Sequence, residues 1–126
     1  MTQARIAIPS TLPGGLAAEV GGHFGHCDIY TLIDLKDGQI TQVGTLPSIP
    51  HEQGGCLAAV NHLATHGVTA LIAGGMGLRP LMGFQQAGIE VYRGTGAPSV
   101  EAAVQALLQG SLERFSQEST CQGGQH

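Results

Sequence analysis

Residues 68–80, Val-Thr-Ala-Leu-Ile-Ala-Gly-Gly-Met-Gly-Leu-Arg-Pro, decide the predicted fold. The short apolar run from Ala70 to Ala73 predicts a strand that is buried on both faces. The glycine turn Gly74-Gly75-Met76-Gly77 follows, and Leu78-Arg79-Pro80 predicts a helix start, where proline is tolerated. This geometry can direct unpaired backbone N–H groups at an anion. The simpler alternative is a tight turn that needs glycine for its dihedral angles.

Hydrophobic periodicity and turn residues predict the elements on either side of this stretch. Before it we expect strands at Arg5–Pro9, Asp28–Leu35 and Gln39–Leu46 and a helix over 55–66. After it we expect a helix over 78–87, a strand over 89–92, and a helix that Ser99 caps and Gly110 ends. Asp37-Gly38 is among the strongest short hairpin signals. The order β, ββ hairpin, αβαβα predicts an α/β fold with a mixed five-stranded sheet and flanking helices.

Two irregular segments interrupt this pattern. The first, 10–25, is expected to be a long loop with one helical turn over 16–20, and the second covers 46–55. Loops of this length in compact domains are usually functional or mobile. We expect the apolar stripes of the first and last helices to face the core, namely Leu57, Val60, Leu63 and Ala64, and Val100, Val104, Leu107 and Leu108.

Length and composition exclude several classes of protein. With 126 residues the chain is expected to form one domain over 1–110, followed by a flexible C-terminal tail over 111–126. No apolar run approaches the length of a membrane span, so we expect a cytoplasmic protein. A net charge of −4, with five Lys and Arg, provides no basic surface for nucleic acid.

Histidine and cysteine residues are the candidate metal ligands. His23, His26 and Cys27 precede a strand, His51 lies in the second loop, and Cys56 lies in the first turn of a helix. A helix N-terminus lowers a thiol pKa and favours the thiolate, which binds soft metals. The spacing matches no structural zinc motif, and each residue has a simpler interpretation as a buried thiol or a loop histidine.

Other histidines and cysteines are interpreted mainly as surface residues. His62 and His66 are expected on the exposed side of a helix, with metal ligation as the lesser alternative. Cys121 and His126 are interpreted as tail residues without a fixed partner. The alternative is that they form a flexible pair that folds over a bound metal.

The carboxyl ends of the parallel strands define the expected binding edge of the sheet. We expect this edge to include Ser10, the glycine turn 74–77 and residues 93–96, with Arg79 and Arg93 as the two cations near it. The two arginines could pair with an anionic ligand or could simply be solvated. The first strand carries no carboxylate for two-metal hydrolysis, and 74–77 is neither a Walker loop nor a dinucleotide fingerprint.

Three segments together resemble the dinitrogenase iron–molybdenum cofactor biosynthesis family, which includes NifX-type carriers and the C-terminal part of NifB-type proteins. They are His23-Phe24-Gly25-His26-Cys27, Ile72-Ala73-Gly74-Gly75-Met76-Gly77 and Gln86-Ala87-Gly88-Ile89-Glu90-Val91-Tyr92. The resemblance covers roughly 5–108. It implies a ribonuclease-H-like fold without nuclease activity, and binding of an iron–sulfur–molybdenum cluster or its precursor, or of another molybdenum- or iron-containing cluster.

The chain departs from this family at the first segment. Members commonly have Arg or Lys and then a small residue after Phe-Gly, whereas this chain has His26 and Cys27. Serine is frequent in the family where this chain has His23. These substitutions replace a cation with potential ligands, which favours direct metal ligation.

We therefore expect a carrier of a metal–sulfur cluster and not an enzyme. The cluster would be bound transiently and passed to cofactor-assembly or acceptor proteins. Three cysteines cannot supply the four thiolates of an ordinary [4Fe–4S] cluster, whereas a preassembled cluster needs fewer protein ligands. Two alternatives remain open: a mononuclear zinc or copper module, and a small-molecule enzyme in which His51 activates Cys56.

Overall fold

The computed structural model describes residues 3–20, 29–47, 55–74, 78–94, 99–110, 112 and 114. The strands are β1 (Gln3–Ser10), β2 (Ile29–Lys36), β3 (Gln39–Pro47), β4 (Ala70–Ala73) and β5 (Glu90–Arg93). The helices are α1 (Gly55–Thr65), α2 (Leu78–Gln86) and α3 (Val100–Leu108). All eight elements lie within two residues of the predicted bounds.

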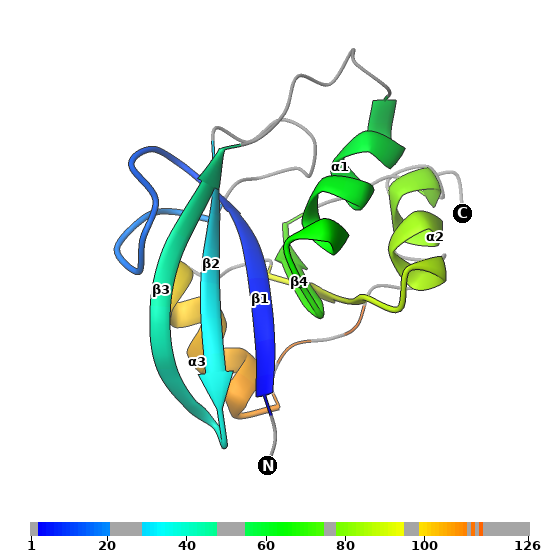
Figure 1. The fold of residues 1–126 in the computed structure, drawn as a ribbon. Helices are drawn as coiled ribbons and strands as arrows, with labels where there is room; N and C mark the ends of the chain where they lie inside the picture. The colour runs from blue at the N-terminus through cyan, green and yellow to red at the C-terminus, as the bar shows by residue number, and fades with distance from the viewer. Residues whose placement is uncertain are drawn as a thin grey trace, which may run out of the picture.

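The strands form one mixed sheet in the order β3-β2-β1-β4-β5 (Figure 1). β1 pairs antiparallel with β2, and β2 pairs antiparallel with β3, with a register shift at Asp34/Leu35. β1 pairs parallel with β4, and β4 pairs parallel with β5. The predicted α/β class and mixed five-stranded sheet are confirmed.

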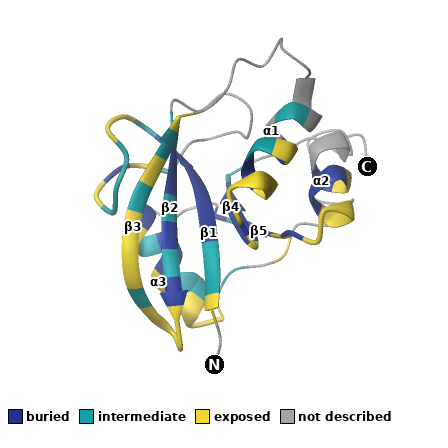
Figure 2. Ribbon diagram, viewed as in Figure 1, coloured by how far each residue is buried: buried dark blue, intermediate teal, exposed yellow. Residues whose placement is uncertain are grey.

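Helices cover both faces of the sheet and bury its central strands (Figures 1 and 2). On one face Val60 and Leu63 of α1 and Leu81 and Phe84 of α2 pack with sheet residues that include Leu71. On the other face Val100, Ala103 and Val104 of α3 pack with sheet residues that include Ile6, Ile8 and Ile72. β4 is buried over its whole length, as its uninterrupted apolar run predicts.

Residues with positive φ mark the turns that the sequence predicts. Asp37 and Gly38, at φ 54° and 82°, form the two-residue turn between β2 and β3. Gly67, Gly88 and Gly110 follow α1, α2 and α3 with φ between 76° and 80°. Glycine adopts this left-handed conformation at little cost, so these residues end the helices. The predicted hairpin and helix ends are confirmed.

Three local predictions are wrong. Residues 16–20 form no helical turn: only a turn bond joins the Ala18 amide to the Gly15 carbonyl, and Val20 pairs with Ser10 as an antiparallel bridge. Ala64 of α1 and Leu108 of α3 are exposed. The buried residues of α3 are Val100, Ala103 and Val104, so Ala103 and not Leu108 faces the sheet.

Candidate functional site

The carboxyl ends of β1, β4 and β5 meet at one edge of the sheet. Ala7 of β1 lies opposite Leu71 of β4, and Ala73 of β4 lies opposite Arg93 of β5. Because parallel strands in register end together, Ser10, Gly74 and Gly94 mark this edge, which we call the upper edge (Figure 1).

The roots of both predicted ligand loops lie at the upper edge. Ser10 pairs with Ile29 at the start of β2, and Ile29 pairs with Pro47 at the end of β3. Val20 also pairs with Ser10. The residues flanking segment 21–28 and the residue preceding segment 48–54 therefore lie side by side, although they are far apart in the sequence.

Most of the predicted ligands lie outside the described residues. This applies to His23, His26 and Cys27 in the first segment, to His51 in the second, and to Gly75, Met76 and Gly77 of the glycine turn. The backbones of Cys56 and Arg79 are described as parts of α1 and α2. Their roles in binding stay predictions.

A chain of buried hydroxyl groups fixes the upper edge on the α3 face. Ser10 Oγ donates to the Ile8 carbonyl at 2.7 Å and lies 2.8 Å from Thr31 Oγ1. Since the Ser10 proton goes to Ile8, Thr31 donates to Ser10, and the Gly15 amide donates to Thr31 at 3.0 Å. Both side chains are at most 1% exposed. The Ser10 hydroxyl thus anchors the loop that follows β1, and a cofactor-binding role for Ser10 stays a prediction.

The carbonyls of this loop also cap α3. The amides of Val100 and Glu101 donate to the carbonyls of Ala18 and Leu16 at 2.8 and 3.0 Å, while Ser99 Oγ accepts from the Ala102 amide. The first N–H groups of α3 are therefore bonded within the protein. Segment 11–20 consequently ties the upper edge to the helix on one face.

Gly94 allows close packing where β5 ends. Its amide donates to the Ala73 carbonyl at 2.9 Å, and a Cβ added there would lie 2.7 Å from Ile72 Cγ2 and 3.8 Å from Val20 Cγ1. Sequence reasoning placed residues 93–96, which include Gly94 and the half-buried Arg93, at this edge, but it missed Thr31. A glycine just beyond a predicted strand is a signal of close backbone packing, whereas a threonine within a strand carries no such signal.

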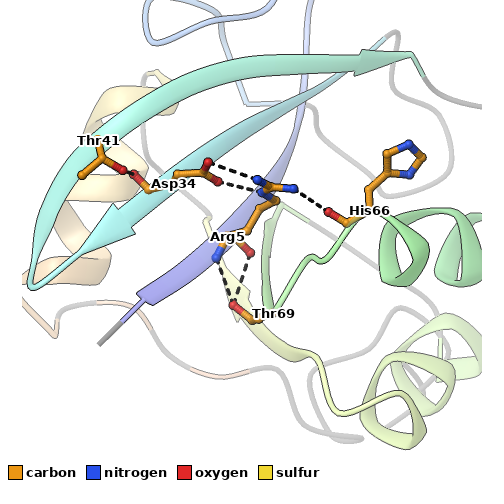
Figure 3. Close-up of polar contacts among 5 residues, drawn as sticks. All are labelled: Arg5, Asp34, Thr41, His66 and Thr69. Carbon is orange, nitrogen blue, oxygen red and sulfur yellow. Dashed lines mark hydrogen bonds and ion pairs between the residues drawn. The ribbon is translucent and has the colours of Figure 1, made fainter. Parts of the chain in front are cut away.

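A second polar network holds the opposite edge together (Figure 3). Arg5 of β1 binds both carboxylate oxygens of Asp34 through Nε and Nη2, at 2.7 and 3.2 Å, and donates from Nη1 to the His66 carbonyl at 2.8 Å. The hydrogen bond to Asp34, and secondly the carboxylate charge, raise the pKa of Arg5. This network joins β1, β2 and the end of α1.

Arg114 contacts β5 near the same opposite edge. It forms a bridge with Tyr92, and its guanidinium lies 3.4 Å from Glu90 and 5.9 Å from the centre of the Tyr92 ring. Leu112 packs against the α3-side core. The domain boundary at residue 110 stays a prediction.

Two features are absent from the described part of the chain. Across residues 3–20, 29–47, 55–74, 78–94 and 99–110, no three His, Cys, Asp or Glu side chains gather as a metal site would require. Within the same ranges, no helix has both the length and the apolar character for crossing a membrane.

The sequence profile described as "Dinitrogenase iron-molybdenum cofactor" matches residues 3–110. The chain belongs to this family. The dinitrogenase iron–molybdenum cofactor family therefore covers every strand and helix described above, and the resemblance inferred from the three sequence segments is confirmed.

Individual proteins resemble the chain over most of its length. Protein MJ0580 of Methanocaldococcus jannaschii is 26% identical over 95 residues, which are 74% of this chain and 80% of that protein. The Thermotoga protein TM1290, a proposed NifB protein of the DUF35 family, is 30% identical with a TM-score of 0.73, and the match covers 91% of this chain and 98% of that one.

The apo form of the orange protein from Desulfovibrio gigas shares the fold. Its TM-score is 0.77 at 24% identity, with 89% of this chain and 92% of that chain covered. The arrangement of strands and helices in this family member therefore matches solved structures along nearly the whole described part.

Proposed function

We propose that the chain binds and carries a metal–sulfur cluster, an iron–sulfur or iron–molybdenum species, during assembly of a metallocofactor. Membership in the dinitrogenase iron–molybdenum cofactor family fits a role in biosynthesis or binding of that cofactor. The observation that carries the proposal is the upper edge, where three parallel strand ends lie beside the roots of two loops, of which one contains His23, His26 and Cys27 and the other contains His51.

The donors available near these loop roots suit a preassembled cluster as cargo. Cys27 and Cys56 would supply thiolates, and His23, His26 and His51 would supply imidazoles. A cluster that brings its own sulfides needs few protein ligands and carries negative charge. Backbone amides after β4, with Arg79 and Arg93, would neutralise part of this charge. Few ligands would also permit transfer to an acceptor protein.

The strand order also supports a ribonuclease-H-like classification. An antiparallel β1-β2-β3 unit continued by parallel β4 and β5 gives the order 3-2-1-4-5. We infer that the fold is used here for binding, because β1 carries no carboxylate that could hold catalytic metal ions.

Anaerobic reconstitution with iron, sulfide and molybdate tests this function. We expect wild-type protein to retain metal and acid-labile sulfide after gel filtration, and the double variant C27A/C56A to lose both. C121A is the matched control, because it removes a thiol from the tail; it should retain the cluster. A C27A/C56A variant that retains the cluster would contradict the ligand assignment.

The same measurements separate the alternative functions. Bound metal without acid-labile sulfide would replace the proposal by a mononuclear zinc or copper module. Absence of any metal uptake by the wild-type protein would contradict both metal-binding functions. Titration of the Cys56 thiol tests the enzyme alternative, which requires a lowered pKa at that sulfur.

A further inference from the structure

His62, in the last turn of α1, and His66, directly after the end of that helix, form a pair. They are separated by four residues, so their side chains project from the same side of the helix. Their ring centres lie 4.9 Å apart, with the ring planes inclined by 72°. His62 is half-buried and His66 is exposed, so solvent and ions can reach the pair.

Each imidazole uses one nitrogen to bind a backbone carbonyl. His62 Nε2 lies 3.1 Å from the Pro47 carbonyl oxygen, and His66 Nδ1 lies 2.8 Å from the His62 carbonyl oxygen. A carbonyl oxygen only accepts hydrogen bonds, so the proton must be on the ring nitrogen in both cases. These contacts assign the Nε2–H tautomer to neutral His62 and the Nδ1–H tautomer to neutral His66.

The second nitrogen of each ring then carries a lone pair. These atoms are Nδ1 of His62 and Nε2 of His66. Histidines that bind metals usually donate their other N–H to a carbonyl or carboxylate, which orients the ring and increases the basicity of the ligating nitrogen. Both rings of this pair already have that second hydrogen bond.

We propose that His62 and His66 form a two-histidine site for a divalent transition-metal ion, separate from the predicted cluster ligands. Imidazole nitrogens suit copper, nickel and zinc, and Cu²⁺ is bound most tightly by such donors. Solvent would complete the coordination. The site uses only residues 62 and 66 and does not depend on the proposed carrier function.

The electrostatic surroundings permit a cation at this position. The C-terminal end of a helix favours positive charge. Arg5 Nη1 lies 2.8 Å from the His66 carbonyl, but both carboxylate oxygens of Asp34 pair with that guanidinium. The His66 ring points away from Arg5 and Asp34 (Figure 3).

The tautomers can be measured in the metal-free protein. Long-range ¹H–¹⁵N spectra at pH 8 should show a protonated Nε2 for His62 and a protonated Nδ1 for His66. Substoichiometric Cu²⁺ should then broaden the signals of both rings. Opposite tautomers, or histidine signals that Cu²⁺ leaves sharp, would overturn the proposal.

Matched variants separate ligation from structure. In H62Q the glutamine amide can still donate to Pro47, and in H66N the asparagine amide can still donate to the His62 carbonyl, but neither supplies a ligating nitrogen. Each variant should remove one Cu²⁺ site or weaken it about tenfold or more, because a chelating partner is lost. Circular dichroism of both should match the wild type.

The variant H51A/C56A distinguishes this site from the predicted cluster site. It should keep the Cu²⁺ broadening at His62 and His66, whatever it does to cluster uptake. Broadening that disappears in H51A/C56A and persists in H62Q and H66N would contradict the proposal, because the copper would then be held by the loop residues.

Discussion

The two edges of the sheet are held by different chemistry. At the upper edge the contacts are buried hydroxyl and backbone hydrogen bonds, which run from Gly15 through Thr31 and Ser10 to Ile8. At the opposite edge Arg5 binds Asp34 and Arg114 binds Glu90. A neutral, buried network can fix the strand ends without presenting a carboxylate to an anionic cargo. The ion pairs stabilise the end of the sheet that lies away from the residues flanking segments 21–28 and 48–54.

The largest effect is expected from breaking the upper network with Thr31→Val. The fully buried Ser10 hydroxyl and the partly buried Gly15 amide would each lose a partner. Leaving buried polar groups unsatisfied should lower the free energy of unfolding by about 2 kcal/mol. Urea unfolding measures this loss, and hydrogen exchange of the Gly15 amide should become faster.

Thr45→Val is the matched control for this prediction. Thr45 is exposed on β3, so the same chemical change should alter stability by less than about 0.5 kcal/mol. Because the Thr31 network is neutral, its contribution should not depend on salt. Equal losses in the two variants would contradict a special role for the upper network.

A smaller effect is expected from Arg5→Gln at the opposite edge. The variant loses both hydrogen bonds to Asp34, but the side chains of Arg5 and Asp34 are 41% and 24% exposed, so solvent screens their interaction. We expect a loss of about 1 kcal/mol that decreases at high salt.

The longer and more exposed pair of Arg114 and Glu90 gives the control R114Q, which should change stability by less than about 0.5 kcal/mol. A salt-independent loss in R5Q would remove the contrast between the edges.

The smallest effect concerns Tyr92 and appears only at alkaline pH. Its hydroxyl donates to Glu90 at 2.7 Å, and this hydrogen bond, followed by burial, raises the pKa of Tyr92 above its ordinary value of 10.0. The bond's contribution is therefore complete below pH 10 and is lost as the pH rises through the higher pKa of the folded protein. Wild type should exceed Y92F by about 0.5 kcal/mol at pH 8, with the difference shrinking above pH 10. Urea unfolding of both proteins between pH 8 and a pH above 10 measures this difference in stability. A difference that does not change with pH would contradict the role assigned to the Tyr92–Glu90 hydrogen bond.

Short-range signals explain why so much of the fold could be predicted. Asp37-Gly38 encodes its turn through φ angles that few other residues adopt, and Gly67 encodes the end of α1 in the same way. The apolar run over β4 is too short for a helix and too uniform for a half-exposed strand. Each of these signals lies within the segment that it specifies.

The predictions that were wrong concern contacts between segments. The exposure of Ala64 and Leu108 depends on which side of α1 and of α3 packs against the sheet, which periodicity alone does not specify. Segment 11–20 forms no helical turn, because Val20 pairs with Ser10 and because the carbonyls of Leu16 and Ala18 cap α3.

The sequence alone therefore determined the order of the elements, their turns and the family, because glycine positions and apolar runs are local properties of the chain. Only the tertiary structure decided that Thr31 is the centre of a buried network and that Arg5 contacts Asp34 and His66, which are far from it in the sequence. It also decided that His62 and His66 each have one hydrogen-bonded ring nitrogen. The physical reason is the same in each case. Whether a polar group is paired depends on a partner that folding brings near.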